Sequence, residues 1–252
     1  MHIRGDRVLK TVVETGQLYD KNFFANQQDG AYRSAEIVVP LLLEILGPLG
    51  SVIDVGCGTG AWLSVFQRHG VAQVFGVDGD YVDRQMLYVP RDCFGARDLF
   101  QPIDDSGPYD LACTLEVAEH LPAERAESFV DDLARLSSVV CFSAAIPGQG
   151  GTHHINERWP DYWAKLFAAR GFYPVDLIRP RIWRDNRIEW WYCQNILLFA
   201  TEPAIRANRT LAAGRKGTRD AQLSIVHPRR FQISQRIIAK QAERLRGQSD
   251  RI

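Results

Sequence analysis

Two carboxylates and an imidazole lie close together in the 252-residue chain, at Glu116, Glu119 and His120. If this segment turns helically, Glu116 and Glu119 share one face, because residues three or four apart are neighbours on a helix. With a fourth group, these side chains suit a divalent cation such as Mg²⁺, Mn²⁺ or Zn²⁺. His153 or His154 is the candidate, and we expect only one of them to face the site because adjacent residues in an extended loop point in opposite directions.

A glycine-rich turn forms a second candidate site, in the sequence VIDVGCGTG from Val52 to Gly60. Its glycines stand at alternate positions, which lets a ligand approach the backbone closely. Asp54 would repel a phosphate, so a dinucleotide pyrophosphate is disfavoured. S-adenosylmethionine fits instead, since it has an ammonium, a sulfonium and a carboxylate that amide N–H groups can hold. The expected cofactor-binding residues of this turn are Asp54, Gly56, Cys57, Gly58 and Gly60.

Two further acidic residues end the next two apolar runs. Asp78, followed by Gly79, stands where an acidic side chain can accept hydrogen bonds from both ribose hydroxyls, a residue that NAD would also require. Asp98 stands where it can accept from an adenine exocyclic amine while Leu99 lies on the ring. Together with the glycine turn, these residues make a strong signal for a nucleoside-containing cofactor.

The elements that must position these residues alternate between β-rich and helical patterns. This alternation predicts an α/β fold with a mostly parallel sheet and helices on both faces. Strands are expected at residues 51–55, 73–77, 93–96, 109–115, 138–145, 173–178 and 195–200. Helices are expected at residues 34–46, 61–68, 123–136 and 159–169. Both candidate sites then lie at the carboxyl edge of the sheet, where ligands of open α/β sheets bind.

The C-terminal part of the chain has a different pattern. Residues 181–194 are dense in Trp and Arg and are predicted to form a hairpin that joins the last two strands. After residue 200 the pattern loosens, then resumes as a helix at residues 234–246. We therefore expect one domain over residues 1–200, with its core at 34–200, and a basic extension with one helix over residues 201–252.

The net charge of zero hides an asymmetry, because residues 1–200 hold 18 basic and 26 acidic side chains while residues 201–252 hold 12 and 4. A basic tail can meet phosphate, but arginines on a solvated helix need no partner. No apolar run is long enough to cross a bilayer, and charges near the N-terminus argue against a secretory signal, so a cytoplasmic protein is expected. Five cysteines without a C-x-x-C pair predict reduced thiols.

With these motifs, the chain from about residue 30 to 200 resembles the class I S-adenosylmethionine-dependent methyltransferases. The segment from Tyr109 to Pro122 is similar to the fourth motif of that superfamily. The resemblance implies a Rossmann-like sheet of seven strands in the order 3-2-1-4-5-7-6, whose last strand is antiparallel. It also places a helix before the first strand and leaves the basic helical extension as an appendage.

Four segments resemble a bacterial branch often associated with surface-glycan gene sets, namely SAEIVVP at 34–40, FSAAIP at 142–147, GGTHHINE at 150–157 and WYCQN at 191–195. His154 is selected over His153 because it heads the His-x-Asn-Glu part of this pattern. Small-RNA 3′-terminal 2′-O-methyltransferases and ubiquinone-pathway O-methyltransferases carry a similar E-x-x-E-H motif and depend on a metal. The resemblance thus implies metal ligands at Glu116, Glu119, His120 and His154.

Two ways of deprotonating an acceptor stay open. In the first, the metal lowers the pKa of the acceptor oxygen. In the second, which needs no metal, His154 or His120 is the general base, Glu116 helps to fix the cofactor and Glu119 begins a helix. In either case, Tyr32 and Ser34 are expected to close over the cofactor, as N-terminal segments do in similar enzymes.

These observations lead to the hypothesis of O-methylation of a small molecule or a saccharide. An RNA 2′-O-methyltransferase is the first rival, motivated by the metal-like cluster and the basic tail, although the acidic body disfavours nucleic acid. A non-catalytic scaffold that keeps the cofactor fold is the second. The tail helix has an apolar side that suits docking on the domain or on a second subunit, so a homodimer is one option: Ile237, Ile238, Ala242 and Leu245.

Overall fold

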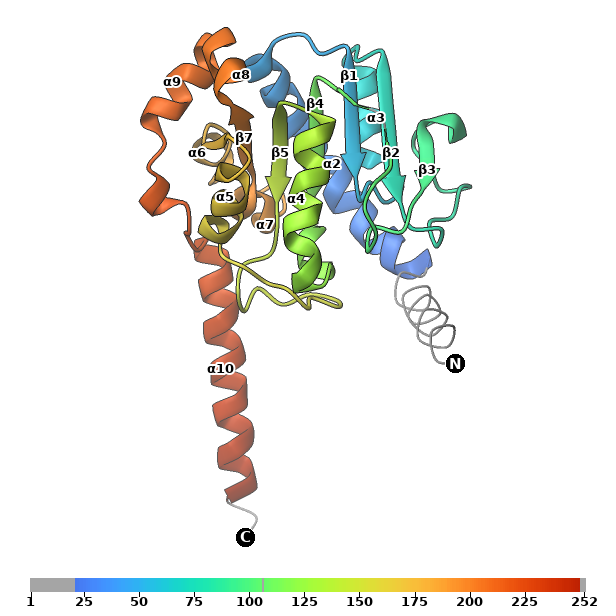
Figure 1. Ribbon diagram of the computed structural model, residues 1–252. Helices are drawn as coiled ribbons and strands as arrows, with labels where there is room; N and C mark the ends of the chain where they lie inside the picture. The colour runs from blue at the N-terminus through green and yellow to red at the C-terminus, as the bar shows by residue number, and fades with distance from the viewer. Residues whose placement is uncertain (1–20, 106, 250–252) are drawn as a thin grey trace, which may run out of the picture.

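The computed structural model describes residues 21–105 and 107–249, and its centre is a seven-stranded sheet (Figure 1). The strand order β3-β2-β1-β4-β5-β7-β6 confirms the predicted order. β7 runs antiparallel to β5 and β6, while the other paired strands are parallel. The strands are β1 (Ser51–Val55), β2 (Gln73–Asp78), β3 (Phe94–Ala96), β4 (Leu111–Leu115), β5 (Val139–Ser143), β6 (Phe172–Val175) and β7 (Leu197–Thr201).

Helices cover both faces of the sheet and enclose two cores (Figure 1). On one face, α2 (Lys21–Leu46) and α3 (Ala61–Arg68) contribute to a core that includes Val52 of β1. On the other, α4 (Ala126–Leu136) and α5 (Pro160–Ala168) contribute to a core that includes Ile53. Successive residues of β1 thus serve opposite faces, as side-chain alternation along a strand requires. Short 3₁₀ turns are η1 (Arg91–Cys93), η2 (Ala118–His120), η3 (Ala123–Arg125) and η4 (Asp220–Gln222).

The hairpin predicted at residues 181–194 is wrong, because this region contains α6 (Arg179–Ile182) and α7 (Trp190–Asn195). Four consecutive residues of α7, at 192–195, are buried. A strand with one solvated face buries only every second side chain, so this run does not suit the hairpin. Tyr192 packs edge-on against Trp62 of α3, with ring centroids 5.2 Å apart, and such tertiary contacts are not readable from the local pattern.

The extension after residue 200 holds three α-helices rather than the single predicted helix. The missed signals are helix caps: the Thr201 side chain accepts from the amide of Ala204, and the Asn208 side chain accepts from Thr210 and Leu211. Leu211 also joins the core beneath α2 and α3, so the first part of the extension packs on the sheet domain. The helices are α8 (Glu202–Ala207), α9 (Arg209–Gly217) and α10 (Pro228–Ser249).

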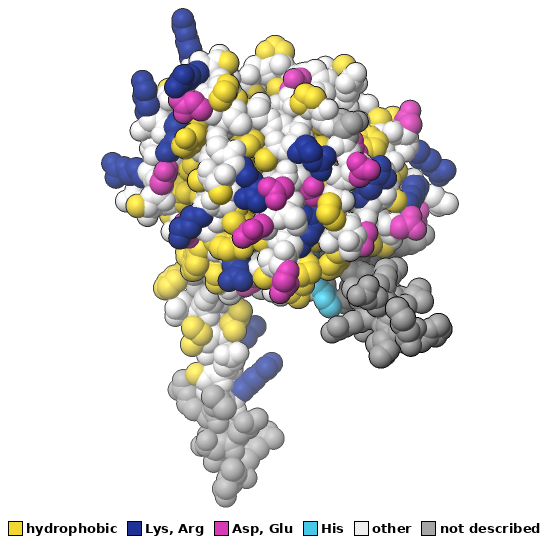
Figure 2. All heavy atoms as spheres, in the orientation of Figure 1, with side chains coloured by type: hydrophobic (Ala, Val, Ile, Leu, Met, Phe, Trp, Pro, Cys, Tyr) yellow, Lys and Arg dark blue, Asp and Glu magenta, His cyan; other side chains and the backbone are white. Residues whose placement is uncertain are grey.

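The last helix, α10, projects away from the sheet domain (Figure 1). Phe231, Ile237 and Ile238 are exposed on it, and Figure 2 shows hydrophobic and basic side chains on the part of it nearer the domain. No helix in residues 21–105 or 107–249 is long and apolar enough to span a bilayer. All five cysteines are free thiols, as predicted, and the domain boundary near residue 200 stays a prediction.

Candidate active site

The glycine turn between β1 and α3 passes through a narrow space. Gly56 has φ +81°, and a Cβ on it would lie 2.3 Å from Val117 Cγ2. Gly60 has φ +80°, and a Cβ there would lie 2.9 Å from Val89 Cγ2. Both positions combine a left-handed backbone with close packing, so only glycine fits them.

Asp78, at the end of β2, holds this turn in place. Its carboxylate accepts hydrogen bonds from the amides of Gly58 and Gly79, both at 2.7 Å, and from the Tyr81 hydroxyl at 2.6 Å. Burial raises the pKa of Asp78 above its usual value, although these three donors act in the opposite direction. The carboxylate therefore joins the two loops that follow β1 and β2.

Asp54 is a second buried carboxyl group at this edge. It lies opposite Gly76 in the β1–β2 pairing and is 2% exposed. Burial, together with the nearby charge of Asp78, raises the pKa of Asp54 to about 8. An added positive charge beside Asp54 would favour its ionised form.

The loop after β3 places Asp98 and Leu99 in different environments. Asp98 is exposed, and its Oδ1 accepts from the amide of Phe100 at 3.0 Å. Leu99 is 8% exposed and belongs to the core beneath α4. The Asp98 side chain is therefore oriented by its own loop, while Leu99 anchors that loop.

The N-terminal residues Tyr32 and Ser34 also lie in different environments. The Tyr32 ring stacks on Tyr88, with centroids 5.4 Å apart, and the Tyr88 amide donates to the carbonyl oxygen of Thr59 in the glycine turn. Ser34 is fully buried, and its hydroxyl donates to the Gly30 carbonyl and accepts from the Glu189 amide. Ser34 thus joins α2 to the start of α7, whereas Tyr32 lies beside the loop that covers the glycine turn.

Glu116 follows β4 in a left-handed conformation, with φ +58°. Its amide donates to the carbonyl oxygen of Ser143 on β5. Its two carboxylate oxygens accept from Gln149 Nε2 at 2.8 Å and from Asn195 Nδ2 at 3.0 Å. Burial raises the pKa of Glu116, while these amide donors oppose the shift. Glu116 is therefore held by a residue of the loop after β5 and by the last residue of α7.

Glu119, in η2, is fully buried, and neither of its carboxylate oxygens has a hydrogen-bond partner among the described residues. Burial and the neighbouring Glu116 raise the pKa of Glu119 well above its usual value. The backbone around it is firmly held, since its carbonyl oxygen accepts from the amides of Ile155 and Asn156. A buried carboxylate without donors is costly unless a cation neutralises it.

The rings of His120 and His154 meet edge to face, with centroids 4.9 Å apart. Nδ1 of His154 lies 2.9 Å from Glu157 Oε1, and Nδ1 of His120 lies 3.3 Å from the carbonyl oxygen of His153. Burial and His154 lower the pKa of His120 to about 4, so His120 is neutral near pH 7. Oxygen acceptors at Nδ1 are typical of histidines that coordinate a metal through the other nitrogen.

Glu119, His120 and His154 bring three potential ligand atoms within 4.8 Å of one another, and Glu116 stands outside this group. His153 is exposed with φ +58°, and it contributes its carbonyl oxygen rather than its ring. The structure therefore brings together three of the four residues expected to hold a metal.

Three residues with direct contacts in the site were not among the expected site residues. Gln149 and Asn195 hold Glu116, and Glu157 holds His154 as well as the amides of Gly148 and Gly150. Asn195 and Glu157 fall in the WYCQN and GGTHHINE segments, so a signal was present, but nothing in the sequence indicated which residues they contact.

The strand order, with one antiparallel strand, is that of the Rossmann-like methyltransferase fold. A model of the methyltransferase domain family matches residues 26–143. Magnesium protoporphyrin IX methyltransferase from Synechocystis PCC 6803, solved with bound S-adenosylhomocysteine, is 20% identical with a TM-score of 0.52, over 74% of this chain and 92% of that one. The methyltransferase domain of bacterial CtHen1-C is 20% identical with a TM-score of 0.50, over 68% of this chain and 98% of that one. No curated protein matches the chain.

The family match and the strand order both agree with the resemblance to class I S-adenosylmethionine-dependent methyltransferases seen in the sequence.

Replacement of Gly56 by alanine tests the narrow turn. Because the new Cβ would lie 2.3 Å from Val117, we expect Gly56→Ala to weaken binding of S-adenosylhomocysteine at least about tenfold and to cost roughly 1–3 kcal/mol of stability. Calorimetric titration and urea unfolding measure the two effects. Gly217→Ala is the control, since nothing lies within 4 Å of its Cβ position. If Gly56→Ala bound S-adenosylhomocysteine as tightly as the wild type does, the glycine turn would not be the cofactor site.

Proposed function

We propose that this methyltransferase transfers the methyl group of S-adenosylmethionine to an oxygen atom of a small molecule or a saccharide. The observation that supports this most directly is Glu119, a buried carboxylate without a hydrogen-bond partner among the described residues, beside the imidazoles of His120 and His154. These groups follow β4 and β5 at the sheet edge that also carries the glycine turn. The site thus offers groups that activate a hydroxyl close to a methyl donor.

In this proposal, different residues around the glycine turn bind different parts of the cofactor. The glycine turn, with Gly56, Cys57, Gly58 and Gly60, lies against the methionine part of the cofactor, and Asp54 faces its ammonium. Asp78 and Gly79 hold the ribose. Asp98 accepts from the adenine amine, Leu99 supports the ring, and Tyr32 covers the turn. Ser34 contributes indirectly, by holding α2 against the start of α7, because its hydroxyl is already bonded to Gly30 and Glu189.

The residues present fit a divalent metal. Glu119 lacks donors, His154 is oriented by Glu157, and His120 is kept neutral near pH 7, the form that coordination requires. We propose Glu119, His120 and His154 as ligands, with Glu116 as a fourth or as a neighbouring acceptor for a cationic group. A divalent ion bound there lowers the pKa of an acceptor hydroxyl.

Transfer itself asks little of the protein beyond alignment and proton removal. The acceptor oxygen forms a bond to the methyl carbon while the carbon–sulfur bond breaks, and the electron pair stays on sulfur as S-adenosylhomocysteine leaves. In the alternative without a metal, His120 or His154 accepts the proton of the hydroxyl. Holding the oxygen in line with the methyl–sulfur bond provides the remaining advantage.

Cofactor affinity is expected to depend on pH through Asp54. With a pKa raised to about 8, its carboxyl group is mostly protonated at pH 7 and mostly ionised at pH 9. Since the ionised form attracts the ammonium, the dissociation constant of S-adenosylhomocysteine should be about tenfold lower at pH 9 than at pH 7. Calorimetry on wild type and Asp54→Asn measures this, and the variant corrects for titration of the ligand's own amine. Identical pH profiles in both proteins would refute the role of Asp54.

Metal binding is tested with Glu119→Gln, which keeps the side-chain shape and removes its charge. We expect Mn²⁺ affinity to fall at least about tenfold, and the metal-free protein to become more stable because an unpaired buried carboxylate is lost. Titration calorimetry and thermal unfolding measure the two changes. Glu124→Gln, an exposed neighbour on η3, is the matched control. Unchanged Mn²⁺ binding in Glu119→Gln would exclude this metal site.

The acceptor class is tested by transfer of a labelled methyl group into a host extract. The products are separated into small-molecule, glycan, RNA and protein fractions, with and without EDTA. We expect label in the small-molecule or glycan fraction, and we expect EDTA to abolish it. Label in RNA would replace the proposal by RNA methylation. Binding of S-adenosylhomocysteine without transfer to any fraction would favour a scaffold.

A further inference from the structure

The loop that follows β3 lacks the support that strands give to the other loops of the site. β3 is an edge strand of three residues, and its pairing with β2 ends at Ala96. Beyond it, Arg97 donates its amide to the Asp78 carbonyl, and Asp98 begins a turn through Phe100 and Gln101. Contacts from elsewhere in the fold must therefore determine where Asp98 lies.

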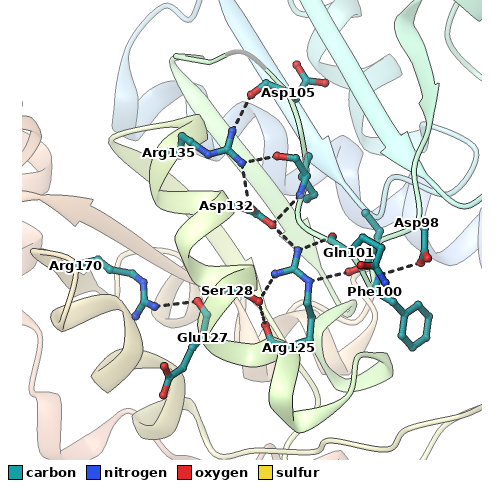
Figure 3. Close-up of polar contacts among 12 residues, drawn as sticks. Asp98, Phe100, Gln101, Asp105, Arg125, Glu127, Ser128, Asp132, Arg135 and Arg170 are labelled. Carbon is teal, nitrogen blue, oxygen red and sulfur yellow. Dashed lines mark hydrogen bonds and ion pairs between the residues drawn. The ribbon is translucent and has the colours of Figure 1, made fainter.

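Those contacts come from the helical segment that begins at η3 and continues as α4, across from the loop (Figure 3). The Arg125 guanidinium donates from Nε to the carbonyl oxygen of Leu99 at 3.1 Å and from one terminal nitrogen to that of Gln101 at 2.9 Å. The same nitrogen is paired with Asp132, and the other donates to the Ser128 hydroxyl at 2.8 Å. One buried side chain thus holds two carbonyl groups directly after Asp98.

Asp132 adds further hydrogen bonds that hold the next part of the loop. Its carboxylate accepts from the amide of Ile103 at 3.0 Å and from Arg135 at 2.8 Å. Arg135 in turn donates to the carbonyl oxygens of Ile103 and Asp105. Arg125 and Asp132 are only 5% and 4% exposed, so water competes little for these contacts.

We propose that Arg125 is a positioning residue for nucleobase recognition, which fixes the loop so that Asp98 selects a 6-aminopurine. The inference rests on the proposed role of Asp98 in binding the adenine amine. The planar guanidinium suits this task because its donors diverge in fixed directions and reach two carbonyl groups and a carboxylate at once. A lysine would keep the charge beside Asp132 but could not reproduce that fork.

Arg170 provides a matched control. It donates to Asp131 of α4 at 2.5 Å, to the carbonyl oxygen of Glu127 of α4 at 2.9 Å and to that of Leu166 of α5 at 2.8 Å. It joins α4 to α5 rather than to the nucleobase loop, as its contact with Glu127 in Figure 3 shows. Arg170→Lys therefore disturbs guanidinium contacts to a carboxylate and two carbonyl groups, two of them on α4, without touching the loop.

The test compares calorimetric dissociation constants of S-adenosylhomocysteine and S-inosylhomocysteine, which carries an oxo group in place of the adenine amine. Wild type and Arg170→Lys should prefer the adenosine ligand by about tenfold, the value of one lost hydrogen bond to a charged group. Asp98→Ala and Arg125→Lys should each reduce this preference to about twofold, and the double variant should lose no more than either alone. Urea unfolding of each variant separates selectivity from stability.

Each outcome has a distinct meaning. An unchanged preference in Arg125→Lys, when that variant is folded, would overturn the positioning role. An unchanged preference in Asp98→Ala together with a loss in Arg125→Lys would reject Asp98 as the adenine acceptor while retaining Arg125 as the residue that fixes the loop. Failure of the wild type to bind S-adenosylhomocysteine would overturn both this inference and the proposed function.

Discussion

The close contact between Gly56 and Val117 is the constraint on which the site depends. Val117 stands between Glu116 and Glu119, so the turn that follows β1 lies directly against the segment that follows β4. Without a Cβ at position 56, Gly58 comes within hydrogen-bond distance of Asp78 and the turn leads into α3. The contact between Gly56 and Val117 thus brings the proposed cofactor-binding turn next to the segment that carries Glu119 and His120.

Buried carboxyl groups dominate the electrostatics of this edge. Asp54, Asp78, Glu116 and Glu119 all have raised pKa values, in each case chiefly because burial penalises their charged forms. Asp78 and Glu116 are partly compensated by hydrogen-bond donors, whereas Glu119 has none among the described residues. An edge of this kind favours cations, which agrees with a ligand that carries an ammonium and a sulfonium, and with the proposed divalent ion.

The sequence predicted the strands because each is short, apolar and followed by a recognisable turn or acidic residue, whereas their order was implied by the resemblance to class I methyltransferases. It failed at residues 181–194, where aromatic residues suggested a hairpin and packing of Tyr192 on Trp62 accompanies a helix instead. Glu116, Glu119 and His120 stood out by their spacing, since one short segment carries them. Their partners Gln149 and Asn195 did not, because segments that are far apart in the sequence meet only after the sheet has formed.

Arg125 and Arg135 donate hydrogen bonds to main-chain carbonyl groups of the loop after β3, and this has an evolutionary consequence. Main-chain carbonyl groups are common to all residue types, so the bond from Arg125 to the carbonyl oxygen of Gln101 places no demand on the Gln101 side chain, which is exposed. Descendants of this chain can therefore change the outer surface of the loop while its path is preserved. The loop can change in sequence while keeping its shape, because its path is determined by side chains of the helical segment rather than by its own side chains.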